Sequence, residues 1–301
     1  MADILSRGTA LNGHIRVFCC RTTDLVQEAK ERHDLWPTAA AALGRTLSIG
    51  CIMGCMLKTN REKIEIQIKG GGPIGEIVVD AYNNGKVRGY CGNPHVHKEK
   101  DDNPLKLDVG YAVGNNGTLK VVKDMSMKQP FISEVEIQSG EIGEDFAYYY
   151  TLSEQTPSAV SVGVLVNTDL NVKAAGALVI QLMPEAIEED IQKVEAVIAE
   201  MKPISTLIDE GGEPKDIIKG FFPDYEELEE QPLRFKCECS KGRFAQVLAK
   251  LPIEDLQTMI DEDHGCEVVC RFCGNKYTYQ QETLEGYIRG QKERQAEKDK
   301  Q

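Results

Sequence analysis

The sequence lacks the features of a membrane or secreted protein. No run of apolar residues reaches the length of about 20 that crosses a bilayer. The start, Met1-Ala2-Asp3-Ile4, carries no basic and apolar leader, so we expect no signal peptide. Ten cysteines without a secretion signal indicate a reducing cytosol, where thiols serve as metal ligands or redox groups. We therefore expect a cytoplasmic protein that does not interact with membranes.

Positive charge is also scarce in this chain of 301 residues. Its 35 lysines and arginines are outnumbered by 48 aspartates and glutamates, which gives a net charge of −13. Such a balance argues against nucleic acid as the main partner. The excess is concentrated from Pro184 to Glu230, where 15 acidic residues stand against 4 lysines. This stretch is either a solvated helical face or an interaction surface.

Recognisable catalytic arrangements are missing too. The sequence offers no combination of serine, histidine and acid, and no paired acids in an apolar setting. The run Gly70-Gly71-Gly72-Pro73 lacks the Lys-Ser/Thr pair of a phosphate-binding loop, so we interpret it as a turn. We therefore expect a protein that is not an enzyme.

Cysteine, by contrast, is concentrated near the C-terminus. Cys237-x-Cys239 and Cys270-x-x-Cys273 form two closely spaced pairs that are separated by 30 residues. Two such pairs can converge on one tetrahedral Zn²⁺. The spacing therefore predicts one zinc ion per chain, with all four thiols as ligands. Cys266 could compete as a ligand, but we interpret it as a bystander thiol on the same loop.

The first pair is unusual, because a structural zinc site normally offers Cys-x-x-Cys. A disulfide within a Cys-x-Cys pair closes a small ring, and strained disulfides are the labile, regulatory kind. Zinc also holds its cysteines as thiolates, which is the form that oxidants attack. The site thus combines a metal with two pairs placed to cross-link when the metal leaves. This combination indicates a switch.

Hydrophobic patterning predicts an α+β protein of three parts. Residues 1–183 form a mixed α/β core domain, and residues 184–231 form an acidic helical linker. The apolar stripe of the linker helix consists of Ile187, Ile191, Val194 and Ile198. Residues 232–301 form a small zinc-binding domain, and a core of about 60 residues is marginal without a staple. Losing roughly 10–16 kcal/mol of metal-binding free energy should unfold it.

Alternating and apolar runs predict the individual elements. Strands are expected at 15–20, 63–69, 76–81, 86–91, 118–123, 131–138, 160–167, 172–182, 267–269 and 277–279. Helices are expected at 24–33, 39–56, 142–153, 187–198, 205–209, 214–221 and 241–251, with another from Ile253 onward. Thr22 and Thr23 are the expected N-caps of the first helix.

Several motifs together carry a family resemblance. The C-terminal ones are Phe235-Lys236-Cys237-Glu238-Cys239-Ser240 and Cys270-Arg271-Phe272-Cys273-Gly274-Asn275-Lys276-Tyr277. The others are His33-Asp34-Leu35 with Pro37, Ala42-Leu43-Gly44-Arg45-Thr46-Leu47, Gly72-Pro73-Ile74-Gly75, Val87-Arg88-Gly89-Tyr90, Ser153-Glu154-Gln155-Thr156-Pro157-Ser158-Ala159 and Ala174-Ala175-Gly176. In these motifs, which span nearly the whole chain, the sequence resembles the 33-kilodalton heat-shock chaperones, the 33 kDa chaperonin family.

The resemblance implies a cytosolic, ATP-independent holdase that responds to heat and oxidative stress. It implies an inactive reduced form in which zinc is bound by the four switch cysteines. It further implies that oxidation makes one disulfide within each pair, Cys237–Cys239 and Cys270–Cys273, and releases zinc. The switch domain and linker then unfold, and the protein binds unfolding client proteins, usually as a homodimer.

Other interpretations of the cysteines are open. A thiol-disulfide oxidoreductase would use Cys270-x-x-Cys273 catalytically, although such a pair normally begins a helix within a βαβ unit. A zinc-ribbon module could bind nucleic acid, although the acidity speaks against it. Cys91 with His95 and His97 is a conceivable second metal site, although loop histidines are usually solvated. No role is assigned to Cys19, Cys20, Cys51, Cys55, Cys91 and Cys266.

Overall fold

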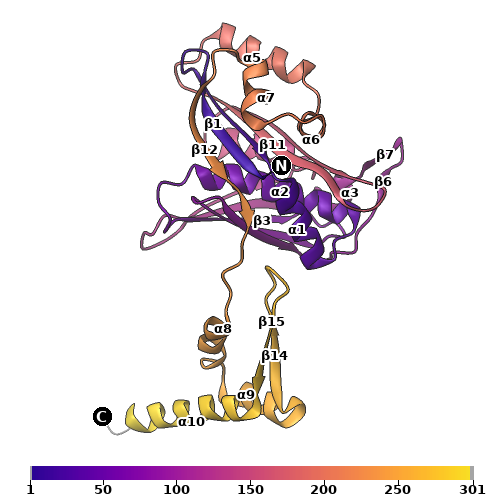
Figure 1. Cartoon of the computed structure of the whole chain (residues 1–301). Helices are drawn as coiled ribbons and strands as arrows, with labels where there is room; N and C mark the ends of the chain where they lie inside the picture. The colour runs from indigo at the N-terminus through magenta and orange to yellow at the C-terminus, as the bar shows by residue number, and fades with distance from the viewer. Residues whose placement is uncertain (1, 299–301) are drawn as a thin grey trace. The chain divides into compact units, whose positions relative to one another are not determined.

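A computed structural model describes residues 2–298 of the chain (Figure 1). The chain divides into two compact units, Met1–Lys236 and Cys237–Gln301. The α+β class expected from the sequence is confirmed, because both units combine helices with antiparallel strands.

Helix α2 (Pro37–Cys55) lies at the centre of the first unit. Pro37 occupies its first turn, where the missing N–H costs nothing. Every position except Pro37 and Arg45 is buried, and a helix that is apolar all round belongs in a core. Its length and hydropathy would also suit a membrane span, although the sequence contains no uninterrupted apolar run long enough to predict one. However, 94% of its most apolar 18-residue window is buried inside the protein, so it is a core helix.

A six-stranded sheet packs against one side of α2. Its strand order is β13-β5-β4-β3-β8-β9, and all neighbours are antiparallel except β13 and β5. The strands are β3 (Lys63–Lys69), β4 (Glu76–Tyr82), β5 (Lys86–Cys91), β8 (Thr118–Asp124), β9 (Phe131–Glu136) and β13 (Arg234–Phe235). The predicted hairpin at β4 and β5 is confirmed, with Gly85 at a positive φ of 71° in its turn.

A five-stranded antiparallel sheet packs against the other side of α2. The strand order is β10-β11-β2-β1-β12. The strands are β1 (Ile4–Ala10), β2 (Ile15–Arg21), β10 (Ser158–Val166), β11 (Val172–Leu182) and β12 (Glu226–Pro232). Side chains alternate across the sheet: Cys20 faces α2, where its thiol donates to the Ser48 carbonyl, whereas Val17 and Cys19 face the opposite side.

Three helices cover that opposite face of the five-stranded sheet (Figure 1). They are α5 (Glu188–Glu200), α6 (Ile204–Asp209) and α7 (Pro214–Phe221), all close to the predicted positions. Their apolar residues, including Val194, Ile208 and Ile218, join Val17 and Leu178 of the sheet in one buried cluster. The predicted stripe of α5 is only partly correct: Val194 is buried and Val197 and Met201 pack beside it, whereas Ile187 and Ile198 are 52% and 41% exposed.

Short elements complete the first unit. These are α1 (Thr23–His33), β6 (Glu99–Lys100), β7 (Asn103–Leu107), α3 (Val109–Val113) and α4 (Gly143–Leu152). The expected hydroxyl cap of α1 is wrong, because Thr22 instead bonds to Ser48 at 2.6 Å between hydroxyl oxygens. The distant carboxylate of Asp3 accepts from the backbone N–H groups of Asp24 and Leu25 and caps the helix in its place.

The second unit is small. It contains α8 (Lys241–Leu248), α9 (Ile253–Asp263), β14 (Gly265–Val269), β15 (Lys276–Gln280) and α10 (Gln281–Lys298). The predicted cap of α8 is confirmed, since Ser240 Oγ accepts from the Arg243 N–H at 3.3 Å. Its buried core consists of Leu248, Leu256, Ile260, Tyr279, Leu284 and Ile288. Helix α10 was not predicted, because its sequence is highly charged and only one end packs on this core.

The close packing of α2 on the six-stranded sheet makes a first prediction. A Cβ at Gly54 would lie 2.8 Å from the backbone oxygen of Tyr82, which cannot move without disturbing β4. Gly54→Ala should therefore lower the free energy of unfolding of the first unit by about 1–3 kcal/mol, despite alanine's better helix propensity. Urea denaturation followed by circular dichroism measures this change.

The matched control is Gly220→Ala in α7, where a Cβ meets nothing within 4 Å. That variant should unfold at the same urea concentration as the wild type or slightly higher. Equal stability of Gly54→Ala and the wild type would contradict the packing described for α2.

Candidate metal centre

Four cysteines converge at one point in the second unit. Cys237 and Cys239 lie in the extended segment that precedes α8, and Cys270 and Cys273 lie in the turn between β14 and β15. Their four sulfur atoms all lie within 4.8 Å of one another. Cys270 and Cys273 are buried, whereas Cys237 and Cys239 are half-buried. The two pairs singled out in the sequence are thus brought together.

The spacing of the sulfurs suits a tetrahedral metal. Zn–S bonds of about 2.3 Å place the sulfurs of a tetrahedral site about 3.8 Å apart. The distance is 3.7 Å between the sulfurs of Cys237 and Cys270, and 3.3 Å between those of Cys239 and Cys273. Four sulfurs at this separation are compatible with zinc, which prefers thiolate ligands in this geometry.

The turn from Cys270 to Cys273 is built to present sulfur. The Gly274 N–H donates to the Cys270 carbonyl at 2.8 Å, and Gly274 itself has a φ of 72°, which suits glycine. Backbone N–H groups of Phe272 and Asn275 bond to the sulfurs of Cys270 and Cys273, respectively. These bonds favour the thiolate form of both side chains, although burial outweighs them in the absence of a metal.

The Cys237-x-Cys239 segment is held by side chains from both of its flanks. Arg243 in α8 donates from Nη1 to the Glu238 carbonyl at 3.0 Å. Tyr277 on β15 donates its hydroxyl to the Cys239 carbonyl at 3.2 Å, and the same hydroxyl lies 3.2 Å from the Cys239 sulfur. Tyr277 therefore ties the first cysteine pair to the strand that follows the second pair.

The four thiols are electrostatically unequal. Burial raises the pKa of Cys239, but hydrogen bonds from Tyr277 and the neighbouring thiols outweigh it and lower that pKa to about 7. Burial raises the pKa of Cys270 and Cys273 above the ordinary range. Cys239, one of the two half-buried members, therefore ionises more readily than Cys270 and Cys273.

The remaining cysteines are outside this cluster. Burial raises the pKa of Cys19, Cys20 and Cys51, and raises that of Cys55 and Cys91 to about 12, so these thiols are poor nucleophiles. Cys266 is partly exposed on β14 and packs beside the core of the second unit.

The conceivable second site at Cys91 does not form among residues 2–298. In this part of the chain, the only group of His, Cys, Asp and Glu residues close enough to share a metal is the four-cysteine cluster. His95 pairs instead with Asp34 at 3.0 Å, and His97 lies 3.4 Å from the Thr38 hydroxyl.

Tyr277 is the functional residue that reasoning from sequence missed. It belongs to the C-terminal motif, but a tyrosine on a short strand is ordinarily interpreted as packing. Residues two positions apart on a strand share a face, so its spacing from the buried Tyr279 is the signal that could have placed Tyr277 on the interior face of β15.

Comparisons with known proteins agree with this architecture. The model of the Hsp33 protein family matches residues 3–280. The 33 kDa chaperonin of Bacillus subtilis is 48% identical over 285 residues, which cover 94% of this chain and 97% of that protein. The 33 kDa chaperonin of Staphylococcus aureus (strain Newman) is 46% identical over 284 residues, covering 94% and 96% of the two chains.

A solved structure resembles the whole chain. The crystal structure of the 33 kDa chaperonin from Thermotoga maritima superposes with a TM-score of 0.90 at 33% sequence identity. The match covers 97% of this chain and 100% of that one. A family model across most of the sequence, close relatives and a shared fold lead to the same conclusion: the chain belongs to the Hsp33 family.

Proposed function

We propose that this chaperone-family protein is a cytoplasmic, ATP-independent holdase that is switched on by oxidation. In this proposal it protects thermally unfolding and oxidatively damaged proteins from aggregation and catalyses no reaction. The observation that carries the proposal is the cluster of four sulfurs in a unit whose core is six buried side chains. A unit with so small a core needs an additional cross-link to stay folded. A metal ion held by four thiolates would be such a cross-link, and oxidation of the thiolates would remove it.

In the reduced state, Cys237, Cys239, Cys270 and Cys273 would hold one zinc ion. The ion would supply a structural cross-link between the segment before α8 and the turn between β14 and β15. The donor set fits, because the sulfurs lie within 4.8 Å of one another and two of them accept backbone hydrogen bonds. Four ligands from the chain leave no open position, which is typical of structural rather than catalytic sites.

Oxidation would begin in the first pair, because Cys237 and Cys239 are half-buried and so more accessible to an oxidant than the buried Cys270 and Cys273; we take Cys239 as the first sulfur. With a peroxide as oxidant, its thiolate attacks one peroxide oxygen, gains a sulfenic acid and releases water or hydroxide. The Cys237 thiol would then attack the sulfenic sulfur of Cys239, displace its hydroxyl group as water and close the Cys237–Cys239 disulfide. Two thiols have then lost two electrons, the peroxide has gained them, and the sulfurs can no longer act as thiolate ligands.

The loop that each disulfide closes indicates which disulfides would activate the protein: those within each cysteine pair. A Cys237–Cys270 bond would close a loop across 33 positions and stabilise the folded unit by roughly 3–4 kcal/mol. Cys237–Cys239 and Cys270–Cys273 close almost no loop, so they leave the unit free to unfold. Cross-pair bonds would instead lock the unit in its folded form.

The linker would respond to oxidation by exposing a client-binding surface. We propose a division into a core at residues 1–183, a linker at 184–231 and a switch domain at 232–301. In the folded protein α5, α6 and α7 cover one face of the five-stranded sheet. Their detachment would leave apolar residues such as Val17, Leu178 and Ile180 open to unfolding clients, while the acidic residues of the linker keep the complex soluble. We propose a homodimer as the active form.

The alternative of a thiol-disulfide oxidoreductase has less support. Its attacking thiol would be Cys270 or Cys273, and both are buried with raised pKa values. The pair also lies in a turn between two strands rather than at the start of a helix.

Removal of one ligand tests the zinc assignment. The reduced wild type should contain one zinc ion per chain by elemental mass spectrometry. Cys270→Ser should lose the ion, and the second unit should unfold, because about 10–16 kcal/mol of apparent binding free energy disappears. The matched control is Cys266→Ser, which should retain zinc and structure. Zinc retained by a variant with all four cysteines changed to serine would reject the site.

Disulfide mapping tests the switch. After peroxide treatment, peptide mass spectrometry should find Cys237–Cys239 and Cys270–Cys273, and aggregation of a thermally unfolding client should be suppressed. Reduced protein should suppress it weakly. The proposal fails if the active oxidised protein contains mainly cross-pair bonds, such as Cys239–Cys273, or if the reduced, zinc-loaded protein is equally active.

A further inference from the structure

The first unit contains a small cavity that is unrelated to the cysteine cluster. Its volume is about 120 Å³, and it lies at the C-terminal end of α2, between the two sheets. Strands β2 and β11 contribute from one sheet and β3 and β8 from the other. Much of its wall is flexible and apolar, and includes Met53, Met56, Ile64 and Met125. Methionine is the side chain that adapts most readily to an irregular ligand.

One polar group in the wall is unsatisfied. The hydroxyl of Tyr150 has no hydrogen-bond partner within the described residues, although Tyr150 is 1% exposed and lines the cavity. Its ring is fixed by an edge-on contact with Tyr149 at 5.8 Å between centroids. Burial raises the pKa of Tyr150, so the group remains a protonated donor. A buried donor without an acceptor is unfavourable, and a ligand that accepts from it would remove that penalty.

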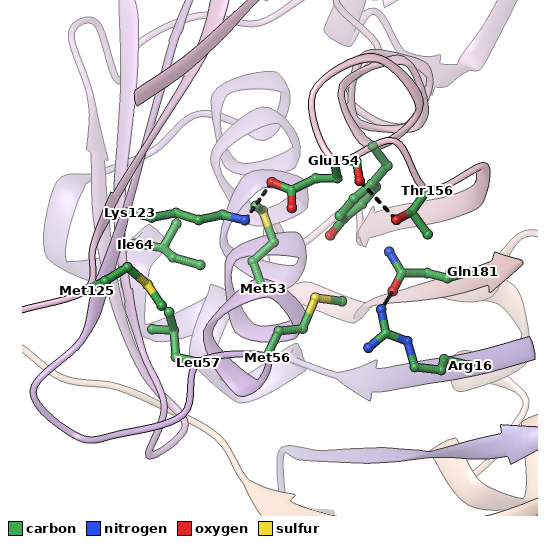
Figure 2. A pocket seen from close by; sticks show the side chains of 11 residues that line it. Arg16, Met53, Met56, Leu57, Ile64, Lys123, Met125, Glu154, Thr156 and Gln181 are labelled. Atoms are coloured by element: carbon green, nitrogen blue, oxygen red, sulfur yellow. Dashed lines mark hydrogen bonds and ion pairs between the residues drawn. The ribbon is translucent and has the colours of Figure 1, made fainter. Parts of the chain in front are cut away.

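Charge around the cavity favours an acceptor of negative sign. Lys123 and Glu154 neutralise each other at 2.5 Å, and Glu154 also accepts from the Tyr149 hydroxyl at 2.6 Å. Arg16 donates to the side-chain oxygen of the uncharged Gln181 at 2.9 Å. Figure 2 shows Met53 and Met56 lying between these two polar pairs. Of the two positive charges in the cavity wall, that of Lys123 is paired with Glu154, and that of Arg16 is not paired with an acidic residue of the wall.

We propose that this cavity binds a small monocarboxylate whose apolar body is no larger than one aromatic ring. The carboxylate would accept from the Tyr150 hydroxyl and from Arg16, and the apolar body would pack on the methionines. The cavity is somewhat smaller than the cavity of about 150 Å³ that binds benzene, so the ring would fill it and the carboxylate would lie at its open side, beside the exposed Arg16. This inference does not depend on the redox switch, because every residue involved belongs to the first unit.

Titration with sodium benzoate tests the proposal on the full-length, reduced, zinc-loaded protein. Binding should be saturable, with a Kd of roughly 1 mM, and should shift the Met53 and Met56 methyl signals in NMR spectra. Tyr150→Phe should weaken binding about tenfold or more, because it removes a hydrogen bond to a charged group. This variant should fold, since it deletes a hydroxyl that has no partner in the described structure. Arg16→Met, at an exposed position, should weaken binding to a similar extent.

Two controls separate this site from non-specific effects. Tyr148→Phe removes a hydroxyl from the same helix at a position 37% exposed and outside the cavity, so the affinity should not change. Benzyl alcohol, which is neutral and of similar size, should bind at least about tenfold more weakly. The proposal is overturned by non-saturable shifts, by an unchanged affinity in Tyr150→Phe, or by equal binding of benzyl alcohol and benzoate. Each of these results would identify the cavity as a site for solvent or for any apolar molecule.

Discussion

In the proposed function the structure of the second unit depends on one convergence, that of the Cys237-x-Cys239 segment on the turn from Cys270 to Cys273. The six side chains of its core cannot by themselves offset the entropy of ordering about 60 residues. The first unit has no comparable dependence, because α2 is buried between two sheets and a second apolar cluster lies on the outer sheet face. Stability is therefore distributed unevenly, and in the proposed switch a chemical change at the four sulfurs would act on the weaker part.

The acidic segment covers a large apolar surface of the first unit. Its helices α5, α6 and α7 are amphipathic, and they bury the face of the five-stranded sheet that α2 does not cover. Its last part, β12, is an edge strand bound to β1, with Arg7 and Glu229 paired at 2.5 Å across the strands. The following strand, β13, pairs with β5 through only two residues. Detachment of the acidic segment would therefore have to break the β1–β12 pairing and expose the apolar cluster that contains Ile204, Ile218 and Phe222.

Local sequence patterns predicted most of the fold and the candidate site, but they did not predict contacts between residues that are distant in the sequence. The spacing of the cysteines was sufficient to find the cluster, and clean alternation located β3 and its neighbours. Strand β12 was missed because Glu226, Glu227, Glu229 and Glu230 read as a solvated stretch, although they border a sheet edge. Asp3 caps a helix that begins 20 positions later, and Tyr277 reaches a sulfur 38 positions earlier. Such contacts depend on tertiary structure that no local pattern encodes.

Hydrogen exchange on the reduced and the peroxide-oxidised protein tests the central claim most directly, because it reports order along the whole chain. The account predicts that amides in residues 237–280 lose protection on oxidation, that those in α5, α6 and α7 lose it as well, and that those in α2 keep it. This pattern should accompany the gain of chaperone activity. Full protection of residues 237–280 in oxidised protein that suppresses client aggregation would contradict the account.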